Sequence, residues 1–287
     1  MPRYPVTFAM TVDDVGFGDE PDAFVDLDKF FGGLDLPVTY FVTPRWGDVP
    51  IYEKPAWLAA LRHSAMQPRR AFALHGLRHD TPFEFGWTHP YMGRADHDRE
   101  WATRRDEVRA GLRRQALQEK LAEGQRIFEH VFGAPAKVFR SPYAAVCEDL
   151  WAALLWAGIA ADSSKVINWD LWRYWRQEVF PPVDWDPDLP PHLRQADGLW
   201  HAPIMAEYSW MLTDNAQVER CFGRALDDFH RVREREDGLF VMVCHVEQTS
   251  REFVKGREVI RRLVEVMKQD KNVRFVTLPG LIAEVAR

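Results

Sequence analysis

Residues 6–14, VTFAMTVDD, form a β-rich run that ends in two adjacent carboxylates, Asp13 and Asp14. The same arrangement, a short β-rich run followed by a polar residue, recurs along the chain. The predicted strands are 6–12, 37–43, 71–74, 137–139, 158–161, 199–205, 239–244 and 273–278. Helical patterns lie between them at 101–132, 148–156, 215–235 and 256–269. Strands that alternate with helices in this way indicate a mainly parallel α/β sheet or barrel.

The chain of 287 residues suits one large domain and can bury a large core without disulfides. Two segments interrupt the alternation: 80–100, rich in Gly, Pro, His and aromatic residues, and 166–198, rich in Trp and Pro. Both contain many large apolar side chains, so neither is typical of a flexible linker. We therefore predict a single domain over 1–287 with two elaborated loops.

Composition excludes several classes of function. A net charge of -6 does not suit a nucleic-acid binder. Three widely spaced cysteines, Cys147, Cys221 and Cys244, predict neither a disulfide framework nor a zinc–thiolate site. No apolar leader precedes the first strand, and the longest apolar stretch, 150–161, is too short to span a membrane. We expect a cytoplasmic protein that acts on a small molecule or glycan, and the sequence indicates no oligomeric state.

Six side chains of metal-binding or titratable type fall at or just beyond the C-terminal ends of predicted strands. They are Asp13, Asp14, His75, Arg140, Asp162 and His245. In an α/β barrel these strand ends share one face, and the active site is built there. One polar residue at a strand end is ordinary, but six at successive ends are difficult to explain as packing. The sequence therefore predicts an active site at this face.

The two pairs, His75 with His79 and Asp13 with Asp14, suggest a metal site. Imidazole is a common metal ligand, and an i, i+4 spacing can direct two side chains at one point in a turn. Alone the spacing is a weak signal, since His79 fits equally well as an exposed loop residue. Adjacent carboxylates strengthen the case, because one can bind a metal while the other acts as a general base. A turn aspartate before Gly16 is the simpler explanation for one of them, but not for both.

His245 and Arg140 have plausible roles at the same face. His245 follows Val241 and Val243 at period two, so the three share a face, and Cys244 points away from them. This argues against a Cys–His nucleophilic pair. His245 can donate a proton to a leaving amine, although a buried structural histidine is the alternative. Arg140 can hold a carboxylate through paired hydrogen bonds, and a surface arginine is the alternative.

Taken together, these segments resemble the polysaccharide deacetylase family, also called the NodB-homology group or carbohydrate esterase family 4. Five ordered motifs carry the resemblance over nearly the whole chain. They are TVDDVG at 11–16, HGLRH at 75–79, RSPY at 140–143, Asp162, and VMVCH at 241–245. The resemblance implies a distorted (β/α) barrel of about seven strands.

The resemblance also implies a role for each residue of the motifs. The metal ligands would be Asp14, His75 and His79. The other roles would be Asp13 as general base, His245 as general acid, Arg140 orienting Asp13, Asp162 tuning His245, and the Tyr143 backbone N–H binding the oxyanion. Zn²⁺ is the expected metal, and two histidines with one aspartate and open positions also suit Co²⁺, Ni²⁺ or Fe²⁺.

Two positions depart from the family pattern. Val15 stands where the family usually has glycine, and Gly16 follows it. The family also places a tryptophan four residues after the Asp of the fourth motif, but residue 166 is valine. Trp169 is the nearest replacement. The second departure affects the apolar pocket for an acetyl methyl group more than it affects the metal site.

The expected activity is metal-dependent removal of an acyl group, such as acetyl, from an amide of an N-acetylated sugar or cell-surface glycan precursor. Hydrolysis of a small non-sugar amide, such as a cyclic imide or ureide, is an alternative within the family. A catalytically inactive sugar-binding protein on the same fold is an alternative from another class. The aromatic residues that could stack on a sugar, or equally cover the barrel as a hydrophobic plug, are Trp169, Trp172, Tyr174, Trp175 and Trp185. Further candidates to line the pocket are His89, His97 and His201.

Overall fold

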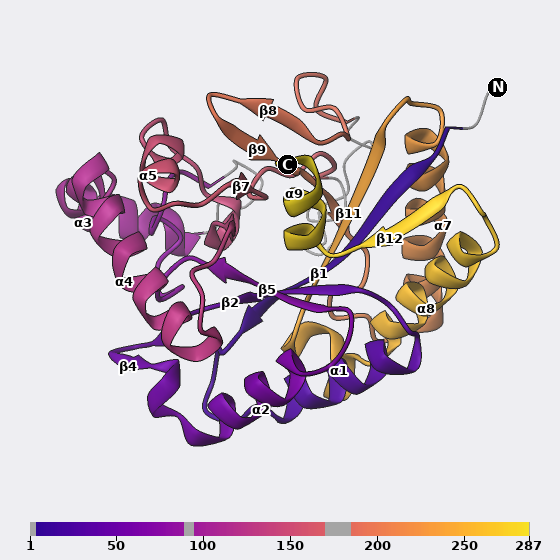
Figure 1. Ribbon diagram of the computed structural model, residues 1–287, viewed down its shortest axis with the longest axis horizontal. Helices are drawn as coiled ribbons and strands as arrows, with labels where there is room; N and C mark the ends of the chain where they lie inside the picture. The colour runs from indigo at the N-terminus through magenta and orange to yellow at the C-terminus, as the bar shows by residue number, and fades with distance from the viewer. Residues whose placement is uncertain (1–3, 89–94, 170–184, 287) are drawn as a thin grey trace.

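The computed structural model describes residues 4–88, 95–169 and 185–286, and in this part of the chain ten strands form one curled sheet (Figure 1). In spatial order the strands are β10 (Ile204–Glu207), β11 (Gly238–His245), β1 (Val6–Val15), β2 (Val38–Val42), β5 (Arg70–His75), β6 (Val138–Arg140), β7 (Ala161–Asp162), β9 (Leu199–His201) and β8 (Arg194–Ala196). β12 (Val273–Val276) pairs with β1. Every pair is parallel except β8 with β9. A separate hairpin joins β3 (Arg45–Trp46) to β4 (Val49–Pro50).

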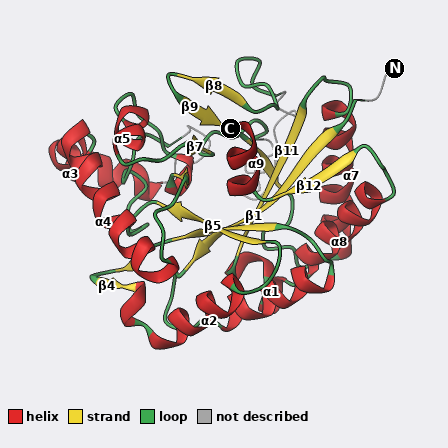
Figure 2. Cartoon of the chain, in the orientation of Figure 1, coloured by secondary structure: helices red, strands yellow, loops and turns green. Residues whose placement is uncertain are grey.

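Helices cover the convex side of the sheet, and one further helix lies within its curve (Figure 2). The outer helices are α1 (Asp22–Gly33), α2 (Pro55–Ala65), α3 (Ala95–Gly111), α4 (Arg114–Phe132), α5 (Leu150–Trp156), α7 (Asn215–Val232) and α8 (Lys255–Lys268). The inner helix is α9 (Leu278–Val285). This arrangement confirms the predicted barrel-like α/β fold. Within the described ranges, no helix has both the length and the apolar character needed to cross a membrane.

Backbone hydrogen bonds connect the two ends of the curled sheet. The segment that follows β7 runs beside β10, at the opposite end of the strand order. Ile204 N donates to Lys165 O at 2.8 Å, and Ile167 N donates to Ile204 O at 2.8 Å. Asn168 N continues this pairing by donating to Met205 O at 2.9 Å. The sheet therefore curls far enough for its strand ends to surround a common space.

Apolar side chains divide into an inner and an outer layer, because neighbouring residues of a strand point to opposite faces. Phe8, Met10 and Val12 of β1 belong to the large outer cluster beneath the helices. Ala9 belongs to the inner cluster, which has small residues on several strands and is filled from one end by α9. The inner cluster comprises Ala9, Phe41, Ala73, Val138, Ala161, Ala202, Leu239, Val241, Val276, Leu278, Leu281 and Ile282. Residues that continue the inner face beyond this cluster reach the C-terminal ends of the strands.

Two predicted elements, one helix and one strand, are wrong because each is divided into two elements in the structure. The predicted helix 101–132 is divided into α3 and α4, because α3 ends at Gly111 and Arg113 is extended, with φ -68° and ψ 148°. The predicted strand 199–205 is divided into β9 and β10. Pro203 lies between them, and a proline cannot donate a hydrogen bond to a neighbouring strand.

A buried carboxylate on α7 anchors the described part of the 166–198 segment. Asp228 accepts hydrogen bonds from Asn168 Nδ2 at 2.7 Å, Trp185 Nε1 at 3.0 Å and the Tyr208 hydroxyl at 2.8 Å. The Arg231 guanidinium lies 4.0 Å from the centre of the Trp185 ring. Trp185 is therefore a packing residue of the outer layer, which favours the structural interpretation of this tryptophan over sugar stacking.

Candidate active site

A β-bulge brings Asp13 and Asp14 to one side of β1. Val12 pairs with Tyr40 and Val15 pairs with Val42, so β1 has one more residue than β2 between these two pairs. Asp14 has φ 61°, in the left-handed region that non-glycine residues rarely adopt. Regular alternation would turn Asp14 away from Asp13, whereas a bulge redirects a side chain. Val15, the departure from the family motif, is buried and resumes the pairing with β2.

Asp14, His75 and His79 place their ligand atoms around one point. The Nε2 atoms of His75 and His79 lie 3.4 Å and 3.2 Å from Asp14 Oδ1. Ligands bound tetrahedrally at about 2.0 Å from a zinc ion are about 3.3 Å apart. Asp14 Oδ1 and His75 Nε2 are buried and have no hydrogen-bond partner among the described residues, an arrangement that is costly unless a cation satisfies both atoms. The three side chains therefore fit a divalent metal ion.

The surroundings of these residues favour the ligand forms of their side chains. His75 Nδ1 lies 3.1 Å from the carbonyl oxygen of Arg140, so its N–H donates there and Nε2 keeps a free lone pair. Burial alone would raise the pKa of Asp14, but the nearby His79 and His245 outweigh burial and hold it well below its usual range. His79 also has a positive φ, 56°, so two of the three candidate ligands have left-handed backbone. Backbone strain of this kind concentrates at functional sites.

Arg140 is buried against Asp13, the partner that the family resemblance implies for it. Its Nη1 donates to Asp13 Oδ1 at 2.7 Å and to Thr11 Oγ1 at 2.8 Å. Its Nη2 donates to Ser163 Oγ at 2.8 Å, and its Nε donates to the Ser163 carbonyl at 3.0 Å. The guanidinium also lies 4.0 Å from the centre of the Phe41 ring. These contacts fix the guanidinium, and through it the orientation of the Asp13 carboxylate.

The carboxylate in contact with His245 is Glu207, whereas the family resemblance implied that Asp162 would tune this histidine. His245 Nδ1 lies 2.8 Å from Glu207 Oε2, and Glu207 is fully buried. β10 lies next to β11 in the sheet, which brings Glu207 alongside His245, whereas Asp162 is on the more distant β7. Asp162 instead accepts a hydrogen bond from Ser164 Oγ at 2.5 Å and lies 3.8 Å from His201 Nδ1.

The charges around His245 favour its protonated form. Burial alone would lower the pKa of His245, but Glu207 and Asp14 outweigh burial and raise it to about 9. Because Nδ1 faces Glu207, the other ring nitrogen is the one available to a reacting group. The site thus combines a candidate acid, His245, with a candidate base, Asp13, whose strands pair directly at these two residues.

Aromatic rings contact His79 and His245. The Phe17 ring centre lies 5.6 Å from that of His79 and 3.9 Å from that of Trp46. The Trp210 ring centre lies 4.8 Å from that of His245, in an edge-on arrangement. None of these three aromatic residues was predicted from the sequence. The one available signal was proximity, because Phe17 follows the first motif directly and Trp210 follows a strand end.

Trp169 lies close to the site, although no tryptophan stands at residue 166. It is 7% exposed and packs in a small cluster with Val166, Ile204 and Val243, against which Ala144 also packs. This location suits an apolar wall beside the reacting group. Five other predicted lining residues, or their side chains, lie outside the part of the chain that the structure describes. They are Trp172, Tyr174, Trp175, His89 and His97.

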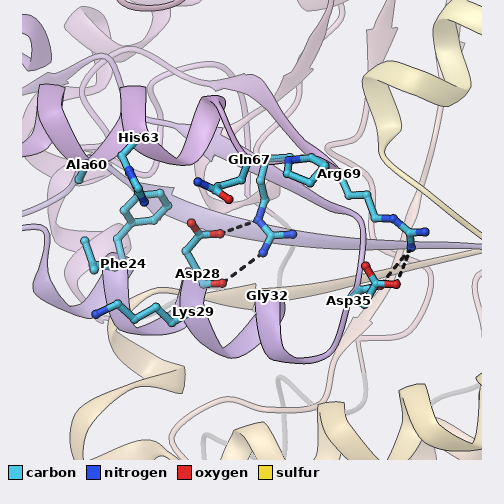
Figure 3. Close-up of a pocket in the computed structure, with 12 residues that line it drawn as sticks. Phe24, Asp28, Lys29, Gly32, Asp35, Ala60, His63, Gln67 and Arg69 are labelled. Carbon is cyan, nitrogen blue, oxygen red and sulfur yellow. Dashed lines mark hydrogen bonds and ion pairs between the residues drawn. The ribbon is translucent and has the colours of Figure 1, made fainter.

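A groove with a volume of about 470 Å³ lies elsewhere, between α1 and α2 (Figure 3). None of the predicted site residues lines it. Its carboxylates are already paired: Asp28 accepts hydrogen bonds from Arg70 Nε at 2.6 Å and from the Tyr40 hydroxyl at 2.5 Å, and Asp35 lies 3.4 Å from Arg69 Nη1. We therefore locate the chemistry at the strand ends and not in this groove.

Comparisons with known proteins support the fold. No family model matches the sequence, and no curated protein matches it. A solved structure from Mycobacterium smegmatis, assigned as a polysaccharide deacetylase, covers 100% of this chain and 94% of its own, with a TM-score of 0.63 and 14% identity. A CE4 family pseudoenzyme from Bacillus anthracis covers 98% of this chain and 66% of its own, with a TM-score of 0.51 and 10% identity.

An enzyme of different activity shares the architecture. The 4-α-glucanotransferase from Thermococcus litoralis has a TM-score of 0.57 and 10% identity, and covers 99% of this chain and 41% of its own. The resemblance predicted from the motifs is therefore confirmed as a resemblance of fold. Because one fold supports several activities, the function has to be argued from the site itself.

Proposed function

We propose that this protein is a metal-dependent hydrolase that removes an acyl group, acetyl in particular, from an amide nitrogen of an N-acetylated sugar or glycan precursor. The observation that carries the proposal is the convergence of Asp14, His75 and His79 beside the Asp13 carboxylate and the His245 imidazole. Zinc is the proposed metal, with cobalt, nickel or iron as alternatives that the same donor set accepts.

The residues around the proposed metal site divide the reaction between them. A bound divalent ion supplies Lewis-acid polarisation of the amide carbonyl and of a water molecule. The Asp13 carboxylate, oriented by Arg140, accepts a proton from the attacking water. The Tyr143 backbone N–H donates to the developing oxyanion, an interaction whose loss costs about 3 kcal/mol in comparable sites. His245, kept protonated by Glu207, donates a proton to the leaving nitrogen.

The apolar and aromatic surroundings support a sugar amide as the substrate. The ring of Phe17 contacts His79 and Trp46, and the ring of Trp210 contacts His245. Aromatic side chains combine a large apolar surface with a defined geometry, which suits the apolar face of a sugar ring. Trp169 and Val243 form the apolar contact that an acetyl methyl group requires.

The proposal is tested by metal analysis combined with an acetate-release assay. The purified protein is expected to contain a divalent metal and to release acetate from N-acetylated sugars. Removal of the metal with a chelator should abolish the release, and added zinc should restore it. Hydrolysis of cyclic imides or ureides in place of acetylated sugars would support the small-amide alternative. A metal-free protein without activity on either class would support an inactive sugar-binding protein.

Replacing Glu207 by glutamine is expected to move the alkaline limit of activity to lower pH. His245 donates its proton only when protonated, so activity falls as the pH rises through the pKa of His245, which is about 9 in the unmodified protein. Glutamine removes the negative charge that faces Nδ1 of His245, so the pKa of His245 falls by about one unit or more. The charges still facing His245 are those of Asp13, Asp14 and His79.

The pH dependence of kcat/KM for the two proteins measures this shift. Glu247→Gln is the matched control, because Glu247 is close in sequence to His245 but its carboxylate lies 3.6 Å from Arg251. The control should keep the alkaline limit of the unmodified protein. An unchanged alkaline limit in Glu207→Gln would show that Glu207 does not set the protonation of His245.

A further inference from the structure

A buried carboxylate outside the predicted motifs binds the turn that carries both candidate histidine ligands. Glu84 is 4% exposed and lies in the loop that follows this turn. Its Oε1 accepts a hydrogen bond from Arg78 N at 2.7 Å, and its Oε2 accepts one from His79 N at 3.2 Å. One side chain therefore satisfies two successive backbone N–H groups, the second of which belongs to a candidate ligand.

The turn has little space to adopt another path. Gly76 has φ 60°, and a Cβ atom at this position would lie 2.6 Å from Glu84 Oε2 and 2.5 Å from Pro142 Cγ. Gly76 thus packs closely against both the Glu84 carboxylate and Pro142, which precedes Tyr143. A left-handed residue such as His79 keeps its conformation only where its surroundings impose it. The two hydrogen bonds that Glu84 accepts from this turn supply part of that constraint.

Glu84 is itself held from the outside by α4. Lys120 Nζ donates to the carbonyl oxygen of Glu84 at 2.5 Å and to that of Gly111 at 2.9 Å. Gly124 of the same helix packs near the turn, since a Cβ there would lie 3.5 Å from Gly76 O. Glu84 therefore connects α4, through its carbonyl oxygen, to the candidate metal-binding turn, through its carboxylate.

We propose that Glu84 is a positioning residue for the metal site, which fixes the 75–79 turn so that the His79 imidazole faces Asp14 before the metal binds. The inference rests on the proposed function, because it treats His79 as a metal ligand. Outer-shell partners that orient a ligand typically change metal affinity by about 10–100-fold when they are replaced. Glu84 acts in this way on the backbone of the ligand, and it makes no direct contribution to the chemistry.

Glu84→Gln is the direct test, with zinc affinity measured by competition against a chromophoric chelator. Glutamine preserves the shape but has a single acceptor oxygen, so one of the two N–H groups loses its partner. Zinc is expected to bind about 10–100-fold more weakly than to the unmodified protein. Asp80→Asn is the matched control, because Asp80 directly follows His79 and is exposed. This control removes the same charge near the same ligand and should keep the original affinity.

Two further measurements separate positioning from a general effect on the fold. The absorption spectrum of the cobalt-loaded protein reports ligand geometry, and we expect it to change in Glu84→Gln and to be unchanged in Asp80→Asn. Thermal unfolding without metal reports stability. A lower melting temperature with unchanged zinc affinity and an unchanged cobalt spectrum would overturn the inference. If Glu84→Gln does not fold, Glu84→Asp keeps the charge but withdraws the carboxylate, and unchanged zinc affinity there would overturn the inference equally.

The outcome for the unmodified protein distinguishes this inference from the proposed function. If that protein binds zinc and Glu84→Gln binds it equally well, only the role of Glu84 is overturned. If the unmodified protein binds neither zinc nor cobalt, the proposed function and this inference are both overturned.

Discussion

Replacing Asp13 by asparagine is expected to reduce amide hydrolysis by about 10²–10⁴-fold while the metal remains bound. Asparagine keeps an oxygen that can accept from Arg140 Nη1, which lies 2.7 Å from Asp13 Oδ1, but it cannot accept a proton from water. The metal ligands are unchanged, so zinc content should stay near that of the unmodified protein. Acetate release under saturating substrate and metal analysis of the same preparation measure the two quantities.

The control for this variant has to address charge and stability. Asp19→Asn removes one carboxylate from the segment just after β1, where the Asp19 side chain is 88% exposed, and it should leave turnover unchanged. Asp13→Asn also leaves the buried Arg140 without its nearest counter-charge, which is destabilising. Thermal unfolding therefore has to show that the variant is folded at the assay temperature. Full activity in a folded Asp13→Asn protein would assign the base to another residue.

Replacing Asp14 by asparagine is expected to weaken metal binding, unlike the same replacement of Asp13. Asp14→Asn should lower zinc affinity by more than roughly 100-fold, which is the largest typical effect of replacing a residue that only orients a ligand. Turnover should fall with zinc occupancy. Asparagine is the suitable replacement, because it tolerates the left-handed backbone that Asp14 adopts at φ 61°. The effect then reports the lost charge and not a change in the backbone. Zinc titration and acetate release at each zinc concentration measure both effects.

Comparison of the two variants tests the division of roles between neighbouring carboxylates. Zinc retained at its original affinity by Asp14→Asn would show that Asp14 is not a ligand. Zinc lost from Asp13→Asn as well would show that both carboxylates bind the metal. Only an Asp13 variant that keeps zinc and an Asp14 variant that loses it agree with the proposed roles.

Much of this site was predictable, because strand ends are visible in the sequence. The runs before Asp13, His75 and His245 are mostly apolar, and a polar side chain follows each of them. Parallel strands place such ends on one face, so the approach of these residues follows from the fold class. The chemistry of Arg140 predicted a carboxylate partner, and the family resemblance named Asp13, which Arg140 contacts.

The residues that escaped prediction depend on features that the sequence pattern does not contain. Glu207 became the partner of His245 because β10 lies beside β11, and the predicted strand 199–205 stopped before reaching Glu207. Glu84 lies in an irregular loop, where periodicity gives no indication of burial. Asp14 lies on the same side of β1 as Asp13 because of a bulge, which the alternation of apolar and polar residues cannot predict.

The central position of β1 has a consequence for how the protein folds. This strand comes from the beginning of the chain, yet its neighbours β11 and β12 come from the far end. Such non-local pairing raises contact order and slows folding. During synthesis, the edge of β1 that pairs with these strands lacks its partners until β11 and β12 have emerged. Asp13 and His245 face each other across that junction, so the candidate base and the candidate acid come together only when β1 and β11 have paired.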